Sequence, residues 1–341
     1  MNDKMNWNHL ADRQKELEFS GSIYVESNNE ILFSGGFGFA NRAEKILNQP
    51  DTRFSIASGS KIFTSAAICK LAGDGKLTFD TKLIDCLDTE FPHFDEDITI
   101  HHLLTHTSGV PDYFDEDEMD DFEELWEKLP MYSVRSPKDF LPLFQYEKMA
   151  GEADSPFNYN NAGYIILGMV VEQVSGMAFA DYIEEHIFQR AGMYDSGYFS
   201  ADELPGNVAT GYMEKYDSTW KSNIFSLPAK GGPDGGAYVT AADIGLFWKA
   251  LKDGKILTEE MMRVFLKPQV SVGEDIHYGY SGYMETSGEG VVKYIQMGYD
   301  PGVNFRAVHY PGEDITIVVC SNKSDDAYEI LKEAENLILP K

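Results

Sequence analysis

Cysteine is scarce in this sequence, and the few cysteines present form no recognisable pair. The 341 residues include 3 cysteines, Cys69, Cys86 and Cys320, with no Cys-x-x-Cys spacing. A small odd number fits a reducing compartment or a protein indifferent to redox conditions. Cys69 and Cys320 lie in apolar runs, where we expect them to be small buried hydrophobic residues.

Basic residues are also in short supply. Lys and Arg total 28 against 56 Asp and Glu, which gives a net charge of −28. Nucleic acid and anionic membranes would repel such a chain, so neither is an expected partner. No apolar run approaches the roughly 18 residues of a spanning helix, and residues 1–9 contain no apolar signal core. We therefore expect a cytoplasmic protein that is not inserted in a membrane.

Several catalytic motifs are missing as well. The chain lacks His-Glu-x-x-His, Gly-x-Ser-x-Gly and a phosphate-binding loop. His102 and His106 have the i, i+4 spacing that can hold zinc, with His101 beside them, but no Glu or Cys pattern accompanies them. We interpret these histidines as structural, and expect neither a metal nor a cofactor.

The most informative motif that is present is Ser58-x-x-Lys61, at the start of an apolar helix. Residues three apart share a helix face, so the lysine lies beside the serine. A partly desolvated lysine can take the serine proton, and a helix N-terminus offers N–H groups where an oxyanion would form. The pattern predicts acyl transfer with Ser58 as nucleophile. The structural alternative is an N-cap serine with a solvated lysine.

A second Ser-x-x-Lys, Ser218 to Lys221, occurs in a polar stretch without an apolar helix behind it. We interpret this stretch as a surface loop or hairpin. The sequence context therefore favours Ser58 over Ser218 as the nucleophile.

A Tyr-x-Asn motif, Tyr159 to Asn161, stands directly before another apolar helix. A phenol near a lysine and a serine can pass protons between nucleophile and leaving group. Asn161 could cap its helix or bind a substrate carbonyl, and the sequence leaves both roles open.

A third segment runs from Gln296 through Gly298 and Tyr299 to a Pro-Gly turn. A glycine at 298 would let a ligand backbone approach the strand edge, and the N–H of Tyr299 could complete an oxyanion hole. Considered alone, the segment is a strand that ends in a turn.

Strand-like runs lie near both ends of the chain, and helices with long loops lie between them. We expect a helix at 7–18, a hairpin at 22–34, and a close backbone approach in the glycine-rich segment 35–41. The Ser58 helix should stop at 73–75, a short helix should enter through Thr99 and end at 108–109, and the helix from 161 should stop at Gly176. Strands are expected near 278–284, 290–296, 305–310 and 315–321, and a last helix at 325–338. This order predicts one sheet interrupted by a helical insertion. The expected sheet domain comprises 1–85 and 225–341, and the inserted domain comprises 86–224. We interpret the acidic run 112–124 as a solvated face or mobile loop.

Taken together, the three motifs resemble those of the serine β-lactamase and penicillin-binding protein superfamily. The tyrosine of the second motif is typical of its class C β-lactamase-related branch, which includes D,D-carboxypeptidases, D-aminopeptidases and family VIII esterases. The resemblance implies an α+β fold, an antiparallel sheet flanked by terminal helices with an inserted all-helical domain. It also implies a serine hydrolase that forms an acyl-enzyme on an ester, amide or β-lactam carbonyl of a small molecule or short peptide. The implied roles are nucleophile for Ser58, proton transfer for Lys61 and Tyr159, substrate binding for Asn161, Gln296 and Gly298, and oxyanion binding for the N–H groups of Ser58 and Tyr299.

The chain departs from the family at Gln296, a position that usually carries Lys or His. Glutamine supplies hydrogen bonds but no charge, which weakens the case for an efficient β-lactamase or D,D-carboxypeptidase. Lys293 and Arg306 are the candidates to restore that charge. The departure, with the acidic run, also motivates an alternative, a catalytically silent relative that binds a peptide or cell-wall fragment.

Overall fold

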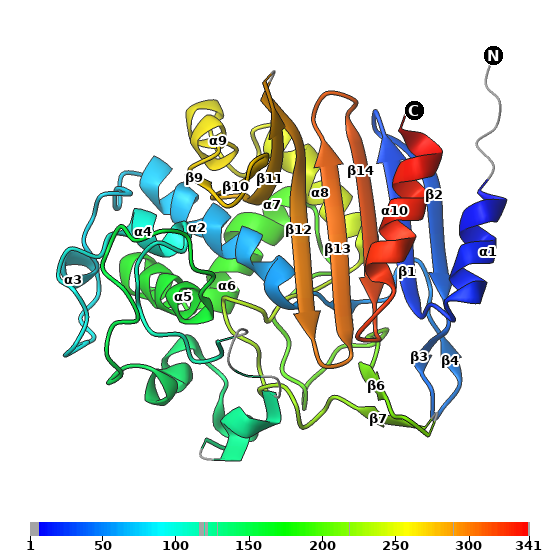
Figure 1. The fold of residues 1–341 in the computed structure, drawn as a ribbon, viewed down its shortest axis with the longest axis horizontal. Coiled ribbons are helices and arrows are strands. Elements are labelled where there is room, and N and C mark those ends of the chain that lie inside the picture. The colour runs from blue at the N-terminus through cyan, green and yellow to red at the C-terminus, as the bar shows by residue number, and fades with distance from the viewer. Residues whose placement is uncertain are drawn as a thin grey trace.

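An eight-stranded antiparallel sheet forms the centre of the molecule (Figure 1). The computed structural model describes residues 7–115, 119, 122–127, 129–217, 219–288 and 290–339. The strand order is β2-β1-β14-β13-β12-β11-β10-β9, so both ends of the chain contribute. The strands are β1 Gly21–Ser27, β2 Glu30–Phe37, β9 Val270–Ser271, β10 Ile276–Gly279, β11 Gly282–Ser287, β12 Gly290–Asp300, β13 Val303–Tyr310 and β14 Ile315–Ser321. The predicted mixed fold with a large antiparallel sheet is confirmed.

Helices cover both faces of this sheet. The terminal helices α1 (Asn8–Glu16) and α10 (Ala327–Ile338) lie on one face, and α8 (Ala241–Lys252) lies on the other (Figure 1). In β14, Ile317 packs in the core beneath α10, whereas its neighbour Val318 belongs to the core on the opposite face. Side chains of a strand alternate between faces, and β14 is apolar on both because both are covered.

The N-terminal hairpin follows directly from its turn sequence. Asn28 and Asn29 have φ angles of 51° and 64°, the left-handed conformations that a two-residue hairpin turn requires. The prediction of a hairpin here is confirmed. After it, Gly36 lies so close to the chain at Asn48 that a Cβ would stand 2.5 Å from the Asn48 carbonyl oxygen. This is the tight approach that the glycine-rich segment predicted.

The helical region is built around α2 (Lys61–Gly73) and α5 (Asn161–Ser175), which pack against each other. Both are buried along most of their length, which explains why their sequences are apolar on nearly every side. The predicted stops are confirmed, since α2 ends at Gly73 and α5 is followed by Gly176 with φ of 73°. The remaining α-helices and strands are α3 Leu83–Cys86, α4 Ile100–Leu104, α6 Phe179–Ile183, α7 Gln189–Ala191, α9 Glu259–Phe265, β3 Phe39–Asn41, β4 Ile46–Leu47, β5 Phe54–Ser55, β6 Tyr212–Glu214, β7 Trp220–Ser222 and β8 Tyr238–Val239.

Two predicted elements differ from the structure. The helix expected up to Ser108 and Gly109 begins after Thr99 as predicted, but α4 ends at Leu104. The chain leaves the helix there because His106 takes a φ of 58°. The single strand expected at 278–284 is two strands, β10 and β11, which turn back on each other before Gly282, where φ is 104°.

Lys221 of the second Ser-x-x-Lys lies in a hairpin, as predicted. Strands β6 and β7 pair with each other, and Lys221 binds Glu123 at the surface. Ser218 lies outside the described residues. The proposed domain limits at 85/86 and 224/225 stay a prediction, although all strands of the main sheet fall within 21–37 and 270–321.

No single helix in the described parts of the chain is long and apolar enough to cross a membrane. Among the described helices, only α5 taken together with residues 179–191 reaches that length and composition, and these two segments meet at an angle of 79°.

One glycine contact joins the helical region to the loop at 230–236, and it can be tested. A Cβ on Gly168 in α5 would lie 2.0 Å from Cγ of Pro233, whose ring cannot turn away. We predict that Gly168→Ala lowers the free energy of unfolding by about 1–3 kcal/mol, the usual cost of overpacking. Urea denaturation measures this. The control is Gly73→Ala in α2, where a Cβ would have its nearest contact at 3.8 Å. Alanine there should raise the free energy of unfolding by at most about 1 kcal/mol. Equal effects of both substitutions would contradict the packing argument.

Candidate active site

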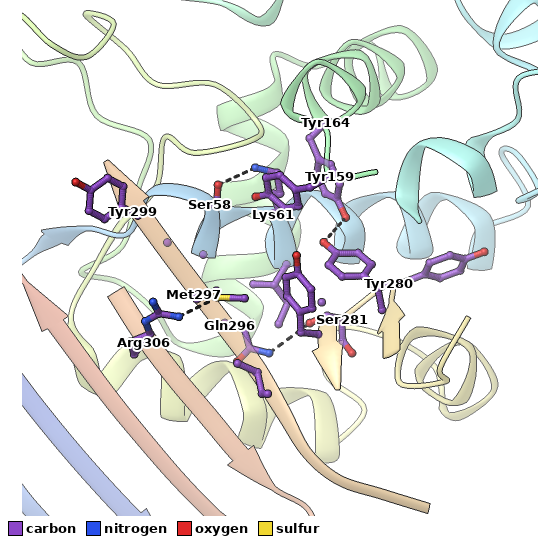
Figure 2. A pocket seen from close by; sticks show the side chains of 17 residues that line it. Ser58, Lys61, Tyr159, Tyr164, Tyr280, Ser281, Gln296, Met297, Tyr299 and Arg306 are labelled. Atoms are coloured by element: carbon purple, nitrogen blue, oxygen red, sulfur yellow. Dashed lines mark hydrogen bonds between the residues drawn. The ribbon is translucent and has the colours of Figure 1, made fainter. Parts of the chain in front are cut away.

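A cavity of about 300 Å³ opens where the start of α2, the end of β12 and the β10–β11 hairpin meet (Figure 2). All three sequence motifs reach it. Its lining includes Ser58, Lys61, Tyr159, Gln296, Gly298 and Tyr299. The structure therefore brings together residues from three distant segments.

Ser58 lies inside a 3₁₀ turn, Ala57–Ser60, which leads directly into α2. The turn is entered through Ala57, a buried residue with φ of 46°, a sparsely populated conformation that places the next residue at a sharp corner. The Ser58 side chain caps no helix, and its Oγ accepts a hydrogen bond from Lys61 at 2.9 Å. The N-cap alternative for Ser58 is therefore wrong.

Lys61 is buried, with only 4% of its surface exposed. Its Nζ contacts Ser58 Oγ at 2.9 Å, Asn161 Oδ1 at 2.8 Å and the carbonyl oxygen of Asp234 at 2.9 Å. A buried amine needs such partners because it has lost its water. The alternative of a solvated lysine is wrong, and one of the hydrogen bonds described for Lys61 is directed at the serine oxygen.

The capping role of Asn161 is excluded by its neighbour, and its substrate-binding role stays a prediction. Asn160 caps α5, because its side chain accepts a hydrogen bond from the Gly163 N–H at 2.7 Å. Asn161 is then free of the capping role, and its Oδ1 binds Lys61. Its Nδ2 donates to Asp112 Oδ2 at 3.3 Å and to the Phe114 carbonyl at 3.3 Å.

Asp112 is a residue of the site that sequence reasoning missed. Its carboxylate accepts hydrogen bonds from the backbone N–H groups of Asn161 and Ala162, each at 2.9 Å, and from that of Tyr113 at 2.8 Å. Burial nevertheless raises the pKa of Asp112 to about 6, and these hydrogen bonds and Lys61 only partly oppose the shift. The solvated-face interpretation of 112–124 is thus wrong at its first residue; residues 116–118, 120 and 121 lie outside the described residues. Asp112 stands at the start of an acidic run, and for this reason its role in the site could not be recognised from the sequence.

Tyr159 lies beside Lys61 in the cavity wall, with the ring centroid 4.9 Å from Nζ (Figure 2). His106 also packs against the Tyr159 ring, at 4.6 Å between ring centroids. Nδ1 of His106 accepts from the Asn160 N–H at 3.0 Å, so Nε2 carries the proton and donates to the Tyr278 hydroxyl at 3.1 Å. Burial, followed by the charge of Lys61, lowers the pKa of His106 well below its usual value. His106 is therefore a neutral side chain that packs against Tyr159 and hydrogen-bonds to Tyr278.

The other two histidines also have partners of their own. His101 Nδ1 lies 2.8 Å from the Tyr280 hydroxyl, and His102 Nδ1 accepts from the Thr99 N–H at 3.2 Å. Among the described residues no group of three or more His, Cys, Asp or Glu is placed to hold a metal ion.

Gly298 brings β12 against the turn that carries Ser58. A Cβ at this position would lie 2.0 Å from the Ile56 carbonyl oxygen and 2.9 Å from the Gly59 nitrogen. The sequence predicted a close approach by a ligand backbone, but the close neighbour here is the backbone of the chain itself.

The N–H of Tyr299 points toward the cavity because of the strand register. Asp300 and Val303 flank the two-residue turn that ends β12, and they form the first pair of the β12–β13 ladder. Hydrogen-bonded and non-hydrogen-bonded pairs alternate along an antiparallel ladder. The next pair, Tyr299 and Asn304, is therefore non-hydrogen-bonded, and the N–H and C=O groups of each residue point away from the partner strand. The pairing of β12 with β11 ends at Ile295, which leaves this N–H on the open edge beside Ser58.

Gln296 is 6% exposed and lines the cavity. Its Nε2 donates to the Ser281 carbonyl at 3.3 Å, and its Oε1 is buried with no hydrogen-bond partner. The Ser281 hydroxyl, also on the cavity wall, is likewise buried without a partner. This part of the wall is polar and uncharged.

A smaller hollow of about 60 Å³ lies on the other side of the nucleophile, and Ser58, Tyr299, Asn161 and Asp234 all border it. The Asp234 carboxyl is buried and accepts a short hydrogen bond from the Tyr113 hydroxyl. Burial raises the pKa of Asp234, against the opposing effects of Lys61 and Tyr113. Sequence reasoning missed Asp234, which stands between glycine pairs in a loop that showed no catalytic signal.

The comparisons with known proteins agree with this geometry. The sequence profile of the Beta-lactamase family matches residues 12–338. Penicillin-binding protein 4* of Bacillus subtilis (strain 168) is 30% identical over 339 residues, which cover 94% of this chain and 72% of that protein. The crystal structure of a penicillin binding protein from Bacillus halodurans is 49% identical, with a TM-score of 0.93 over 97% of this chain and 100% of that one. D-amino acid amidase from Ochrobactrum anthropi SV3 has a TM-score of 0.76 at 22% identity, covering 99% of this chain and 96% of that one, and supports the fold alone.

The fold and the family define the class of this protein as a serine hydrolase. The chain belongs to the Beta-lactamase family, within the serine β-lactamase and penicillin-binding protein superfamily. The predicted resemblance and the predicted enzyme class are confirmed, and nothing in the comparisons favours a catalytically silent relative.

The raised pKa of Asp112 makes a prediction about stability. Because the folded pKa of about 6 exceeds the unfolded value of about 3.9, the folded protein holds this proton more tightly. The contribution of Asp112 to stability is therefore full below pH 4 and is lost as the pH rises through 6. Relative to Asp112→Asn, we predict that the wild type loses about 2–3 kcal/mol between pH 4 and pH 7. Urea unfolding of both proteins at each pH measures the difference, and a difference that stays constant would contradict the assignment.

Proposed function

We propose that Ser58 is the acylated nucleophile and that Lys61 takes its proton. The observation that supports this most directly is the set of three oxygen contacts at Lys61 Nζ, 2.8–2.9 Å long. A neutral amine has two hydrogens and one lone pair. If the hydrogens go to Asn161 Oδ1 and the Asp234 carbonyl, the lone pair faces the Ser58 hydroxyl and can accept its proton.

In the proposed reaction the Ser58 oxygen forms a bond to the substrate carbonyl carbon, and its proton passes to Lys61. The N–H groups of Ser58 and Tyr299 bind the carbonyl oxygen as it becomes negative. Tyr159 then relays the proton from Lys61 to the leaving group, whose bond to the carbonyl carbon breaks. Water hydrolyses the resulting ester by the reverse set of proton transfers.

We assign positioning roles to the residues behind this centre. Asn161 and the Asp234 carbonyl orient Lys61, and Asp112 orients Asn161 through hydrogen bonds to its backbone and side-chain N–H groups. Gln296 and Gly298 would lie alongside the bound acyl group, on the strand edge that ends at Tyr299.

For the substrate we propose an ester or amide of a small molecule or short peptide, with a D-amino acid at the scissile carbonyl as the first choice. The branch that the three motifs resemble includes D,D-carboxypeptidases and D-aminopeptidases, which supports this choice. The cavity of about 300 Å³ has the size of a small acyl group with its leaving group. We also propose the cytoplasm as the location, on the basis of the acidic composition and the unpaired cysteines, and no nucleic acid as partner.

The second Ser-x-x-Lys offers a matched control for the nucleophile and its base. We predict that Ser58→Ala and Lys61→Ala each lower kcat for p-nitrophenyl acetate or a D-alanine anilide by roughly 10²–10⁴-fold. Ser218→Ala and Lys221→Ala should leave kcat within about twofold. Ser58→Ala should also keep the melting temperature, since its hydroxyl bonds only to Lys61 among the hydrogen bonds described. Normal turnover by Lys61→Ala would refute the proton-transfer scheme.

A further inference from the structure

We propose that His106 holds Tyr159 in the position from which its phenol passes a proton to the leaving group. The inference rests on the proposed function, because it concerns the proton relay assigned there to Tyr159. His106 lies behind the cavity wall, with only 2% of its surface exposed, so it acts through Tyr159 and not on a substrate. It is a positioning residue of the site.

The backbone on both sides of Tyr159 is hydrogen-bonded to His106. The N–H of Asn158 donates to the carbonyl oxygen of His106 at 2.9 Å, and the N–H of Asn160 donates to its Nδ1 at 3.0 Å. The two donors come directly before and directly after Tyr159 in the chain. These hydrogen bonds therefore fix the backbone from which the phenol extends.

The imidazole ring also limits where the Tyr159 ring can lie. The two ring centroids are 4.6 Å apart, with an interplanar angle of 35°. On the cavity wall, Lys61 Nζ lies 4.9 Å from the centroid of the Tyr159 ring (Figure 2). A shift of the imidazole would therefore change the placement of the phenol relative to the amine from which it receives the proton. Proton transfer between side chains is sensitive to such displacements.

His106 can support Tyr159 because its own ring is held at both nitrogens. Nδ1 accepts from Asn160, and Nε2 donates to the Tyr278 hydroxyl at 3.1 Å. That hydroxyl lies 3.4 Å from the Tyr164 hydroxyl, which donates to the Leu104 carbonyl at 3.2 Å. The hydrogens of this chain all point from His106 toward the end of α4. This direction fixes the tautomer and the orientation of the imidazole.

The supporting role requires a neutral imidazole. A protonated ring would carry hydrogens on both nitrogens and would lose the hydrogen bond from the Asn160 N–H. Burial, followed by the charge of Lys61, lowers the pKa of His106 well below its usual value, so the ring stays neutral. His106 therefore takes no proton from Ser58 or Lys61 and contributes through its shape and its hydrogen bonds.

The test uses two acetate esters that form the same acyl-enzyme but release different leaving groups. p-Nitrophenolate is a weak base and leaves without a proton, whereas the alkoxide of benzyl acetate needs one. For both esters kcat/KM reports the steps up to acylation. We expect Tyr159→Phe to lower kcat/KM for benzyl acetate by roughly 10²-fold or more, and for p-nitrophenyl acetate by less than about tenfold. This variant is the reference for a lost relay.

Two substitutions of His106 remove different parts of the support. His106→Leu removes both the acceptor and the imidazole. It should lower kcat/KM for benzyl acetate roughly 10- to 100-fold and for p-nitrophenyl acetate by no more than about threefold, the effect of displacing a catalytic group by about 1 Å. His106→Asn keeps an acceptor near the Nδ1 position and tolerates the φ of 58° at this residue, so it should recover part of the loss. If the leucine variant does not fold, the asparagine variant still has to show the larger loss with benzyl acetate.

A double substitution separates positioning from a merely structural role. With benzyl acetate, His106→Asn/Tyr159→Phe should stay within about threefold of Tyr159→Phe alone, because both changes affect the same relay. The matched control is His309→Leu, which removes a histidine of β13 that stacks on Trp248 of α8 at 4.5 Å between ring centroids. It should leave the ratio of the two kcat/KM values at that of the wild type.

The outcomes distinguish the inference from the scheme on which it rests. Equal losses for both esters in the His106 variants, or losses that multiply in the double variant, would overturn the role of His106 and leave the acyl-enzyme scheme intact. If Tyr159→Phe itself slowed both esters equally, the relay in the proposed function would be overturned instead.

Discussion

The site depends on the burial of a single amine, that of Lys61. Removing an amine from water is costly unless its hydrogen bonds are replaced. Here α2 supplies the lysine, the 3₁₀ turn before it supplies the serine, α5 supplies Asn161, and the loop at 230–236 supplies the Asp234 carbonyl. Because each oxygen comes from a different segment, the helical region must pack correctly before the lysine is satisfied. Ser58 and Lys61 therefore reach their hydrogen-bonded geometry only when the helical region has folded.

A second constraint is the contact of β12 with the turn around Ser58. The backbone of Gly298 lies so close to Ile56 that no side chain fits between them. This contact fixes the separation between two N–H groups, those of Ser58 and Tyr299, that we propose to bind the oxyanion. Their geometry is set by backbone packing and strand register, which are stiffer than flexible side chains.

Much of this arrangement could be predicted from the sequence because its elements carry local signals. The Asn28-Asn29 turn, the apolar helix behind Ser58 and the glycine stop after α5 each specify their structure by short-range chemistry. Asp112 and Asp234 could not be predicted in the same way. Their burial arises from contacts with residues far away in the chain, such as Asn161 and Lys61, and an acidic run or a glycine-rich loop looks solvated until those contacts form.

The central claim is that Ser58 becomes covalently acylated with help from Lys61. The most direct measurement is peptide mapping by mass spectrometry after a fluorophosphonate probe has reacted with the folded protein. The account predicts one adduct on the peptide that contains Ser58, and slow or absent labelling when Lys61 is replaced by alanine. An adduct on another serine, or no adduct on a protein that still hydrolyses esters, would contradict it.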